Sequence, residues 1–279
     1  MTEQRVAFIG GGNMTRAIVT GLLENGFTAE AISVSEPSEE QRNALATDLP
    51  GIFLTADNGE AVSRANSVVL SVKPQILAGV CKQLAESVQA SKPLIISIAA
   101  GPRISDIDAW LGGDIAVARV MPNQPALLRA GISGIFANEK VTDEQMQAAK
   151  KIMSAVGPVV EVAREEDIDA VTAVSGSGPA YIYLVIDMIA AAGIELGLKP
   201  DDARTLAIET AMGASTLAKN SDESMDELIA RVRSPGGTTA AALDSLEAQG
   251  IRDIFLTALT AARDRATALA DQAHDDGRD

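Results

Sequence analysis

Residues 5–18 read Arg5-Val-Ala-Phe-Ile-Gly10-Gly-Gly12-Asn-Met-Thr15-Arg-Ala-Ile18, a strand-like run that passes through glycines into an amphipathic helical pattern. Gly10 permits a tight turn, and Gly12 lets the backbone approach a pyrophosphate. A helix that starts near Asn13 then offers free N–H groups and the positive end of its dipole. Because the glycines follow a strand and precede a helix, the stretch predicts dinucleotide binding. A turn that merely needs glycine is the alternative.

The alternation of strand and helix continues to about residue 163. Short apolar runs typical of strands occur at residues 6–9, 32–34, 67–72, 94–98, 116–121, 131–136 and 159–162. Helical patterns lie between them at residues 15–25, 39–48, 56–65, 76–87, 104–112 and 142–155. Such alternation is typical of a parallel sheet covered by helices on both faces. We therefore predict an α/β domain over residues 1–163, a Rossmann-type doubly wound parallel sheet.

Strand character stops near residue 164. The remaining chain predicts five or six helices, at residues 167–174, 178–196, 201–219, 224–232, 239–249 and 253–272. Ser224 and Glu227 have the spacing of a capping box, which supports one of these helix starts. Several helices are rich in Ala, Ile, Leu and Met, and such faces suggest a partner subunit. We predict an all-α domain over residues 164–279 that mediates self-association.

Composition narrows the function further. The net charge of −15 argues against nucleic acid and anionic membranes as partners. No apolar run approaches the ~18 residues needed to cross a bilayer, and we expect no signal peptide, hence a cytoplasmic protein. One cysteine, Cys81, excludes an internal disulfide, and the one histidine, His274, lies in a charged tail that we expect to be solvated. The composition therefore argues against a catalytic triad and against histidine-bound metals, and we expect no metal.

Further candidate cofactor contacts follow the later strands. Glu36 ends the second strand at the spacing of a ribose-binding acid, and its charge would repel a 2′-phosphate. This favours NAD over NADP, although Arg42 and Ser38 could offset it, and a helix-capping role is the alternative. Lys73 ends the next strand, at the crevice where ligands of parallel sheets bind. A solvated lysine at the strand end is the alternative. Small residues at 97–101 and the polar Asn123 follow strands at the same edge.

Two glycine-bearing segments stand out in the helical region. SGSGPAY (175–181) is expected to break two helices with an irregular turn. SPGGTT (234–239) precedes another helix, and its consecutive glycines and threonines expose backbone N–H groups and hydroxyls. Such a helix start binds an anion without a basic side chain, which suits a small carboxylate. A tight interhelical turn is the alternative for each segment.

These motifs together resemble a known family. IGGGNM (9–14), LSVKP (70–74), SIAAG (97–101), MPN (121–123), AVSGSGPAY (173–181) and SPGGTT (234–239) resemble pyrroline-5-carboxylate reductase, from Val6 to about Leu269. The resemblance implies NAD(P)H-dependent reduction of 1-pyrroline-5-carboxylate to L-proline, the last step of proline synthesis. It also implies a Rossmann domain, a helical dimerisation domain and often a larger ring of dimers.

The resemblance also implies roles for individual residues. Those expected to contact NADP or NAD are Gly10, Gly12, Asn13, Met14, Asn58, Val72, Lys73, Pro74, Ala99, Ala100 and Gly101, in addition to Glu36, which is expected from its spacing alone. Those expected to contact the substrate are Glu165, Ser234, Gly236, Gly237, Thr238 and Thr239. Three positions depart from the common pattern. Thr15 replaces a Gly or Ala and predicts slightly looser packing, Glu36 leaves the NADP assignment open, and Arg231 replaces an Asn found in some relatives.

The expected chemistry agrees with the residues that are present. Tyr181 is followed four residues later by Val185, so the Tyr-x-x-x-Lys pair of another reductase class is absent, and no lysine occurs between Lys151 and Lys199. Carbonyl reduction usually needs such a proton donor, whereas a cyclic imine can arrive protonated and needs mainly positioning. We assign Thr239 the catalytic role of orienting the ring nitrogen. A hydroxyacid-dehydrogenase-like enzyme, a non-catalytic dinucleotide sensor and a structural oligomerisation protein are the alternatives.

Overall fold

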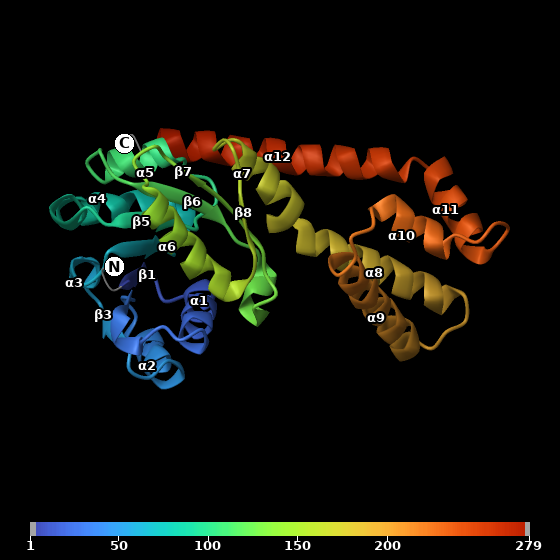
Figure 1. Cartoon of the computed structure of the whole chain (residues 1–279), viewed down its shortest axis with the longest axis horizontal. Helices are drawn as coiled ribbons and strands as arrows, with labels where there is room; N and C mark the ends of the chain where they lie inside the picture. Colours follow the sequence, from blue (N-terminus) through green and yellow to red (C-terminus); the bar gives the residue numbers. More distant parts are fainter. Residues whose placement is uncertain (1–3, 277–279) are drawn as a thin grey trace. The chain divides into compact units, whose positions relative to one another are not determined.

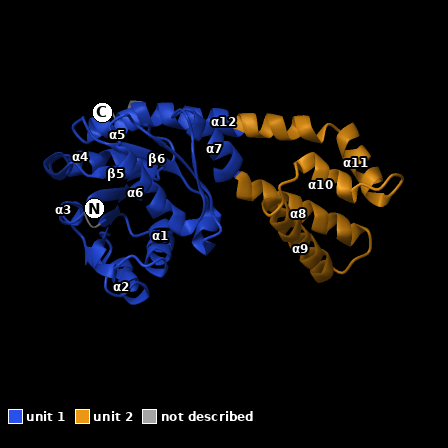
Figure 2. Cartoon of the chain, viewed as in Figure 1, with its two compact units in different colours: residues 1–177, 262–279 blue, residues 178–261 orange. Residues whose placement is uncertain are grey.

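The computed structural model describes residues 4–276, and the chain forms two compact units (Figure 2). Among the described residues, the first unit comprises residues 4–177 and 262–276, and the second comprises residues 178–261. The domain boundary predicted after residue 163 marks the point where strand patterns stop in the sequence, and it stays a prediction. By contacts, the first helix beyond it, α7 (Asp167–Val171), groups with the N-terminal unit.

The first unit is built on one eight-stranded sheet with the order β3-β2-β1-β4-β5-β6-β7-β8 (Figure 1). Val6 in β1 pairs with Ile32 in β2 on one side and with Ser67 in β4 on the other, all parallel. The strands are β1 (Val6–Ile9), β2 (Ile32–Ser35), β3 (Phe53–Thr55), β4 (Ser67–Leu70), β5 (Leu94–Ser97), β6 (Val117–Met121), β7 (Ser133–Ala137) and β8 (Val159–Glu161). This is the predicted Rossmann-type fold.

Two details of the sheet correct the prediction. The β6–β7 pair is antiparallel, so the sheet is only mostly parallel. A short connection of residues 122–132 joins these two strands, and a parallel pair would need a longer crossover. The strand β3 was not expected, because three partly buried residues carry too short an apolar pattern to be recognised.

Helices cover both faces of the sheet, because side chains alternate along each buried strand. In β1, Val6 and Phe8 join one buried cluster, whereas Ala7 and Ile9 join the other. The helices of this unit before α7 are α1 (Asn13–Glu24), α2 (Glu39–Asp48), α3 (Asn58–Ser63), α4 (Pro74–Ser91), α5 (Ile104–Trp110) and α6 (Asp143–Met153). Residues of α1, α2 and α6 belong to the first cluster, and residues of α3, α4 and α5 to the second.

The second unit consists of helices, as predicted. They are α8 (Gly178–Glu195), α9 (Pro200–Lys219), α10 (Met225–Val232), α11 (Thr238–Ala248) and the first part of α12 (Ile251–Asp276). The α8 helix has no buried residue, and five of its large apolar side chains are each about half exposed: Ile182, Tyr183, Leu184, Met188 and Ile189. This unit therefore leaves an apolar surface open to a partner.

The SGSGPAY segment is a continuation of helix, which corrects the expected irregular turn. Residues Thr172–Gly176 form a π-helical segment between α7 and α8, so that one helix runs over Asp167–Glu195. Its length and apolar composition would allow it to cross a membrane, which also corrects the expectation that no segment was long enough. Length and composition alone do not distinguish such a helix from one that a second subunit covers.

The end of the last helix belongs to the first unit, which the sequence did not reveal. Thr267 Oγ1 donates a hydrogen bond of 3.0 Å to Asp169 Oδ2, and Ala270 is fully buried. His274 was expected to be a solvated tail residue; its side chain is 45% exposed, and its Nδ1 contacts Oδ1 of the buried Asp106. The single histidine thus helps to attach the C-terminal helix to the sheet unit.

Candidate active site

The glycine turn after β1 lies where the strand order reverses, between β1 and β4. Gly10 has φ +104°, and a Cβ at this position would lie 2.9 Å from the carbonyl oxygen of Ser71. Only glycine therefore fits the conformation and the close approach to the end of β4. Ligands of open α/β sheets bind in the crevice at such a switch point, beyond the carboxyl ends of the strands.

Thr15 adds a hydrogen bond to the turn, and the looser helix–strand packing expected from it stays a prediction. Its side chain is fully buried, and its Oγ1 donates a hydrogen bond of 2.6 Å to the carbonyl oxygen of Gly10. A close contact that requires glycine occurs six residues further along α1, at Gly21. A Cβ on Gly21 would lie 2.2 Å from the carbonyl oxygen of Ala155.

The start of α1 is open, as an anion site requires. Its N-cap is Gly12, which provides no side-chain hydrogen bond, and its first turn contains no acidic residue. By contrast, Ser38 caps α2 and Thr142 caps α6, and both helices have acidic residues in their first turns. A Cβ on Gly12 would meet no protein atom within 4 Å. The exposed Gly12 and Asn13, followed by Met14, thus fit a diphosphate, which would accept hydrogen bonds from the free N–H groups.

The end of β2 has the acid that a ribose site requires. Glu36 is only 8% exposed, and its Oε2 accepts a hydrogen bond of 3.0 Å from the N–H of Gly11. Its Oε1 accepts a second one, 2.9 Å long, from the N–H of Ser38. Asn58 begins α3, and its Oδ1 accepts a hydrogen bond of 2.7 Å from the buried Ser35. The fold therefore brings Glu36 and Asn58 to the same edge of the sheet as the glycine turn.

The ends of β4 and β5 contribute the segments expected beside the nicotinamide. Lys73 is exposed and is the N-cap of α4, and Pro74 opens that helix; α4 has neither a side-chain cap nor an acid in its first turn. Gly101 follows β5 with φ +104°. The hydroxyls of Ser71 and Ser97 are buried and have no hydrogen-bond partner among the described residues. Val72, Ala99 and Ala100 lie in the same two segments. The hydroxyls of Ser71 and Ser97 and these apolar side chains therefore occur together at this edge.

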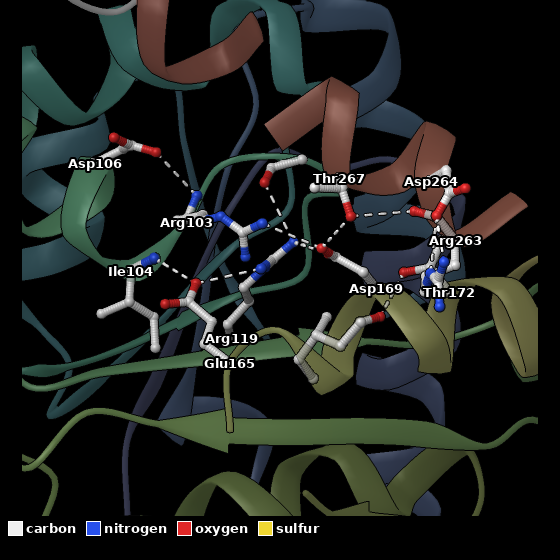
Figure 3. Close-up of polar contacts among 12 residues, drawn as sticks. Arg103, Ile104, Asp106, Arg119, Glu165, Asp169, Thr172, Arg263, Asp264 and Thr267 are labelled. Carbon is white, nitrogen blue, oxygen red and sulfur yellow. Dashed lines mark hydrogen bonds and ion pairs between the residues drawn. The ribbon is translucent and has the colours of Figure 1, made fainter. Parts of the chain in front are cut away.

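Arg119 is the centre of a buried ion-pair network (Figure 3). The Arg119 side chain, 3% exposed in β6, pairs with Glu165 through Nη1 at 3.2 Å and with Asp169 through Nη2 at 3.5 Å. The same Nη2 donates a hydrogen bond of 3.2 Å to the carbonyl oxygen of Gly101. Arg103 Nη2 pairs with Asp169 at 3.1 Å. Burial lowers the pKa of Arg119, and the charges of Glu165 and Asp169 counteract this effect.

Sequence reasoning missed this network, whereas two predicted contact residues, Glu165 and Asn123, have hydrogen-bond partners within the protein. Glu165 was expected to lie near the substrate; its Oε1 accepts hydrogen bonds from Arg119 and from the N–H of Ile104, 2.8 Å away, and its substrate contact stays a prediction. Asn123 was considered a ligand contact, but its Nδ2 donates to the Ser175 carbonyl and its Oδ1 accepts from the N–H of Ile132. The signal for the network was available, since Arg119 is a charged residue inside an apolar strand.

The SPGGTT loop forms a second open helix start, in the second unit. The N–H of Gly237 donates a hydrogen bond of 2.9 Å to the carbonyl oxygen of Ser234, closing a turn in which Gly236 has φ +70°. Proline second and a positive-φ glycine third are the residues that a type II turn prefers. Gly237 is the N-cap of α11, which has no side-chain cap and no acid in its first turn. The exposed Thr238 and half-buried Thr239 begin that helix.

The residues flanking this loop attach it to its own unit. Arg233 pairs with Asp244 on α11, and Arg231 pairs with Glu223 through Nη1 at 2.5 Å. Arg231, near the end of α10, thus pairs with Glu223, which precedes that helix. Within residues 4–276, no group of three or more His, Cys, Asp or Glu is arranged to hold a metal ion.

Comparison with known proteins gives a family match for the N-terminal part of the chain and another for the C-terminal part. Residues 165–269 match the family model "Pyrroline-5-carboxylate reductase dimerisation", and residues 5–101 match "NADP oxidoreductase coenzyme F420-dependent". Pyrroline-5-carboxylate reductase from Pseudomonas aeruginosa is 45% identical over 272 residues, which cover 98% of this chain and 99% of that protein. The chain belongs to the pyrroline-5-carboxylate reductase family.

Solved structures of pyrroline-5-carboxylate reductases have the same fold. The enzyme from Coxiella burnetii is 40% identical, with a TM-score of 0.93, and the match covers 96% of this chain and 99% of that one. The enzyme from Plasmodium falciparum, solved with NADP bound, is 28% identical, with a TM-score of 0.82 over 97% of this chain and 99% of that one. The family resemblance seen in the sequence is thus confirmed over nearly the whole chain.

Proposed function

We propose that this protein is a pyrroline-5-carboxylate reductase that converts 1-pyrroline-5-carboxylate to L-proline with a reduced nicotinamide dinucleotide, NADPH or NADH. One observation carries the proposal: each unit has a helix that starts at a glycine N-cap without a side-chain cap or an acidic residue in its first turn. In a chain of net charge −15, such helix starts provide sites for anions without basic side chains.

The cofactor is assigned to the first of these helix starts. The N–H groups at residues 12–14 are expected to hold the diphosphate, Glu36 and Asn58 the adenosine side, and residues 72–74 and 99–101 the nicotinamide side. When bound, the reduced nicotinamide supplies a hydride for the imine carbon of the substrate. No residue is assigned to a metal.

The substrate is assigned to the second helix start. Its carboxylate is expected to be bound by N–H groups and side-chain hydroxyls of the segment that contains Ser234, Gly236, Gly237 and Thr238. Glu165 is expected near the substrate, as the resemblance implies. Thr239 is expected to hold the ring nitrogen by a hydrogen bond. A protonated cyclic imine loses its positive charge when its carbon accepts a hydride, so that no side chain has to supply a proton. Positioning by these groups then suffices for turnover.

Self-association through the helical unit is part of the same proposal. The half-exposed apolar side chains of α8 lie within the region that matches the dimerisation model. A second copy of this chain is the partner we assign to them, and neither a membrane nor nucleic acid is assigned. A cytoplasmic location fits a biosynthetic reductase of this kind.

Replacing Thr239 by Val tests the assignment of the substrate site. Loss of a hydrogen bond to a charged group costs about 1.5–3 kcal/mol, so kcat should fall about 10- to 150-fold. The dissociation constant for the cofactor should stay unchanged, because Thr239 is assigned to the substrate. Thr205→Val, which removes an exposed hydroxyl bonded only to Asp201 within α9, is the matched control.

Unaltered turnover of Thr239→Val would refute the role of this hydroxyl. Turnover of 3-hydroxy acids in place of the imine would favour a hydroxyacid-dehydrogenase-like enzyme. Cofactor binding without any turnover would favour a dinucleotide sensor.

A further inference from the structure

The carboxylate of Glu36 is held in place by the main chain on both sides. Gly11 donates to one oxygen at 3.0 Å and Ser38 donates to the other at 2.9 Å. A Cβ on Gly11 would lie 3.1 Å from the Cβ of Glu36 and 2.6 Å from Cδ1 of Leu45. The glycine turn therefore packs directly against the Glu36 side chain. Moving this carboxylate away would break two hydrogen bonds and disturb the turn itself.

The remaining hydrogen-bonding capacity of Glu36 suits a ribose with two free hydroxyls. A carboxylate has about four lone-pair sites and can only accept hydrogen bonds. Two of these sites are used by Gly11 and Ser38, which leaves about two for the 2′- and 3′-hydroxyls of an adenosine ribose. A 2′-phosphate offers oxygen acceptors and negative charge at the same position, so that it would meet repulsion instead of hydrogen bonds.

The surrounding residues provide little positive charge to compensate a phosphate. Residues 36–60 contain six acidic residues and one basic residue, Arg42. Arg42 Nη1 donates to the carbonyl oxygens of Glu36 at 2.7 Å and of Pro37 at 2.8 Å, so this nitrogen fixes the loop. Glu39 and Glu40 add further negative charge in the first turn of α2.

Ser38, the other group that could receive a 2′-phosphate, is also engaged. Its hydroxyl oxygen accepts a hydrogen bond of 3.3 Å from the N–H of Gln41 and so caps α2, while its own N–H is used by Glu36. The loop thus uses Nη1 of Arg42 and the N–H of Ser38, and residues 36–60 set one cation against six carboxylates.

We propose that this enzyme uses NADH in preference to NADPH, with Glu36 as the residue that determines the choice. The proposal rests on the proposed function, since it concerns the cofactor of that reaction. The relative from Plasmodium falciparum was solved with NADP bound. That finding does not decide the cofactor of this chain, because the argument here depends on Glu36, Ser38 and Arg42 of this chain. Loss of one ribose hydrogen bond to a charged acceptor predicts at least ~10-fold weaker binding of NADPH.

Titration calorimetry on the full-length oligomer, without substrate, measures this preference independently of catalysis. The dissociation constants of NADH and NADPH are compared for the unaltered enzyme, for Glu36→Gln and for Glu39→Gln. Glu36→Gln removes the charge, keeps the shape and adds an N–H donor, so the ratio of the two constants should fall at least ~10-fold. Glu39→Gln removes an equal charge from the exposed start of α2, three residues away, and should change the ratio less than about 2-fold.

The possible outcomes separate the inference from the function on which it rests. Equal or tighter binding of NADPH by the unaltered enzyme overturns the inference, and turnover with NADPH would then leave the proposed function intact. Equal effects of the two substitutions overturn the role of Glu36. If neither cofactor binds, the proposed function fails together with the inference. The ratio for the unaltered enzyme decides the cofactor choice even if Glu36→Gln does not fold.

Discussion

Replacing Arg119 by Met should destabilise the sheet unit more than the loss of an exposed ion pair would. The Arg119 side chain is 3% exposed and pairs with the carboxylates of Glu165 and Asp169. Removing one partner of a buried ion pair typically costs about 3–5 kcal/mol, because a buried charge is left without compensation. Asp169 would still have Arg103 at 3.1 Å and Thr267 at 3.0 Å. We therefore expect the low end of this range, about 3 kcal/mol.

Urea unfolding followed by the fluorescence of Trp110 measures this loss. Trp110 is the single tryptophan of the chain and lies at the end of α5, in the unit that contains the network. The protomer concentration must be constant, because self-association adds to apparent stability. Arg164→Met is the matched control: Arg164 is 71% exposed and pairs with Asp167 three residues away. We expect no measurable change for the control, since exposed pairs contribute little.

A double substitution tests the cause of the loss. Arg119→Met combined with Glu165→Leu removes both the cation and one unpaired carboxylate, so its cost should be smaller than the sum of the two single costs. An Arg119→Met variant as stable as Arg164→Met would refute the reasoning, because the network would then contribute no more than a surface contact. Strict additivity in the double variant would refute the argument from an unpaired buried charge.

Two further predictions concern the glycine turn and the buried thiol. Gly12→Ala should weaken dinucleotide binding, measured by calorimetry, at least ~10-fold with little change in stability, because the new Cβ meets no protein atom within 4 Å. Gly10→Ala should instead lower the free energy of unfolding by about 1–3 kcal/mol, because this residue has φ +104°; the reverse pattern would contradict the assignment of the diphosphate. Burial raises the pKa of the Cys81 thiol to about 12. Because the unfolded thiol ionises near pH ~8.5, the stability due to the protonated thiol is complete below that pH and declines as the pH rises toward the folded pKa. Cys81→Ala should lose this part of the alkaline decline in urea unfolding, and identical pH profiles for the two proteins would contradict it.

The regular elements could be predicted because their patterns are local. The glycine turn, both helix starts with glycine N-caps and the helix over Glu39–Asp48 follow from residues close together in sequence. The capping box of Ser224 and Glu227 is present as expected. Local hydrogen bonds and side-chain periodicity decide such features, so that sequence is sufficient.

The features that were missed depend on residues far apart in the chain. Arg119 and Asp169 are separated by 50 positions, and Asp106 and His274 by 168. The antiparallel direction of β7 and the attachment of the C-terminal helix to the sheet unit likewise depend on tertiary packing. A charged residue in a buried strand shows that a partner must exist, but it does not say which residue that partner is.

A crystal structure of the enzyme with NADH and L-proline would test most directly whether open helix starts bind the two anions. We predict diphosphate oxygens about 3 Å from the N–H nitrogens at residues 12–14, and the proline carboxylate at the same distance from those at residues 237–239. A carboxylate held by lysine or arginine side chains, with the start of α11 facing only water, would contradict the account.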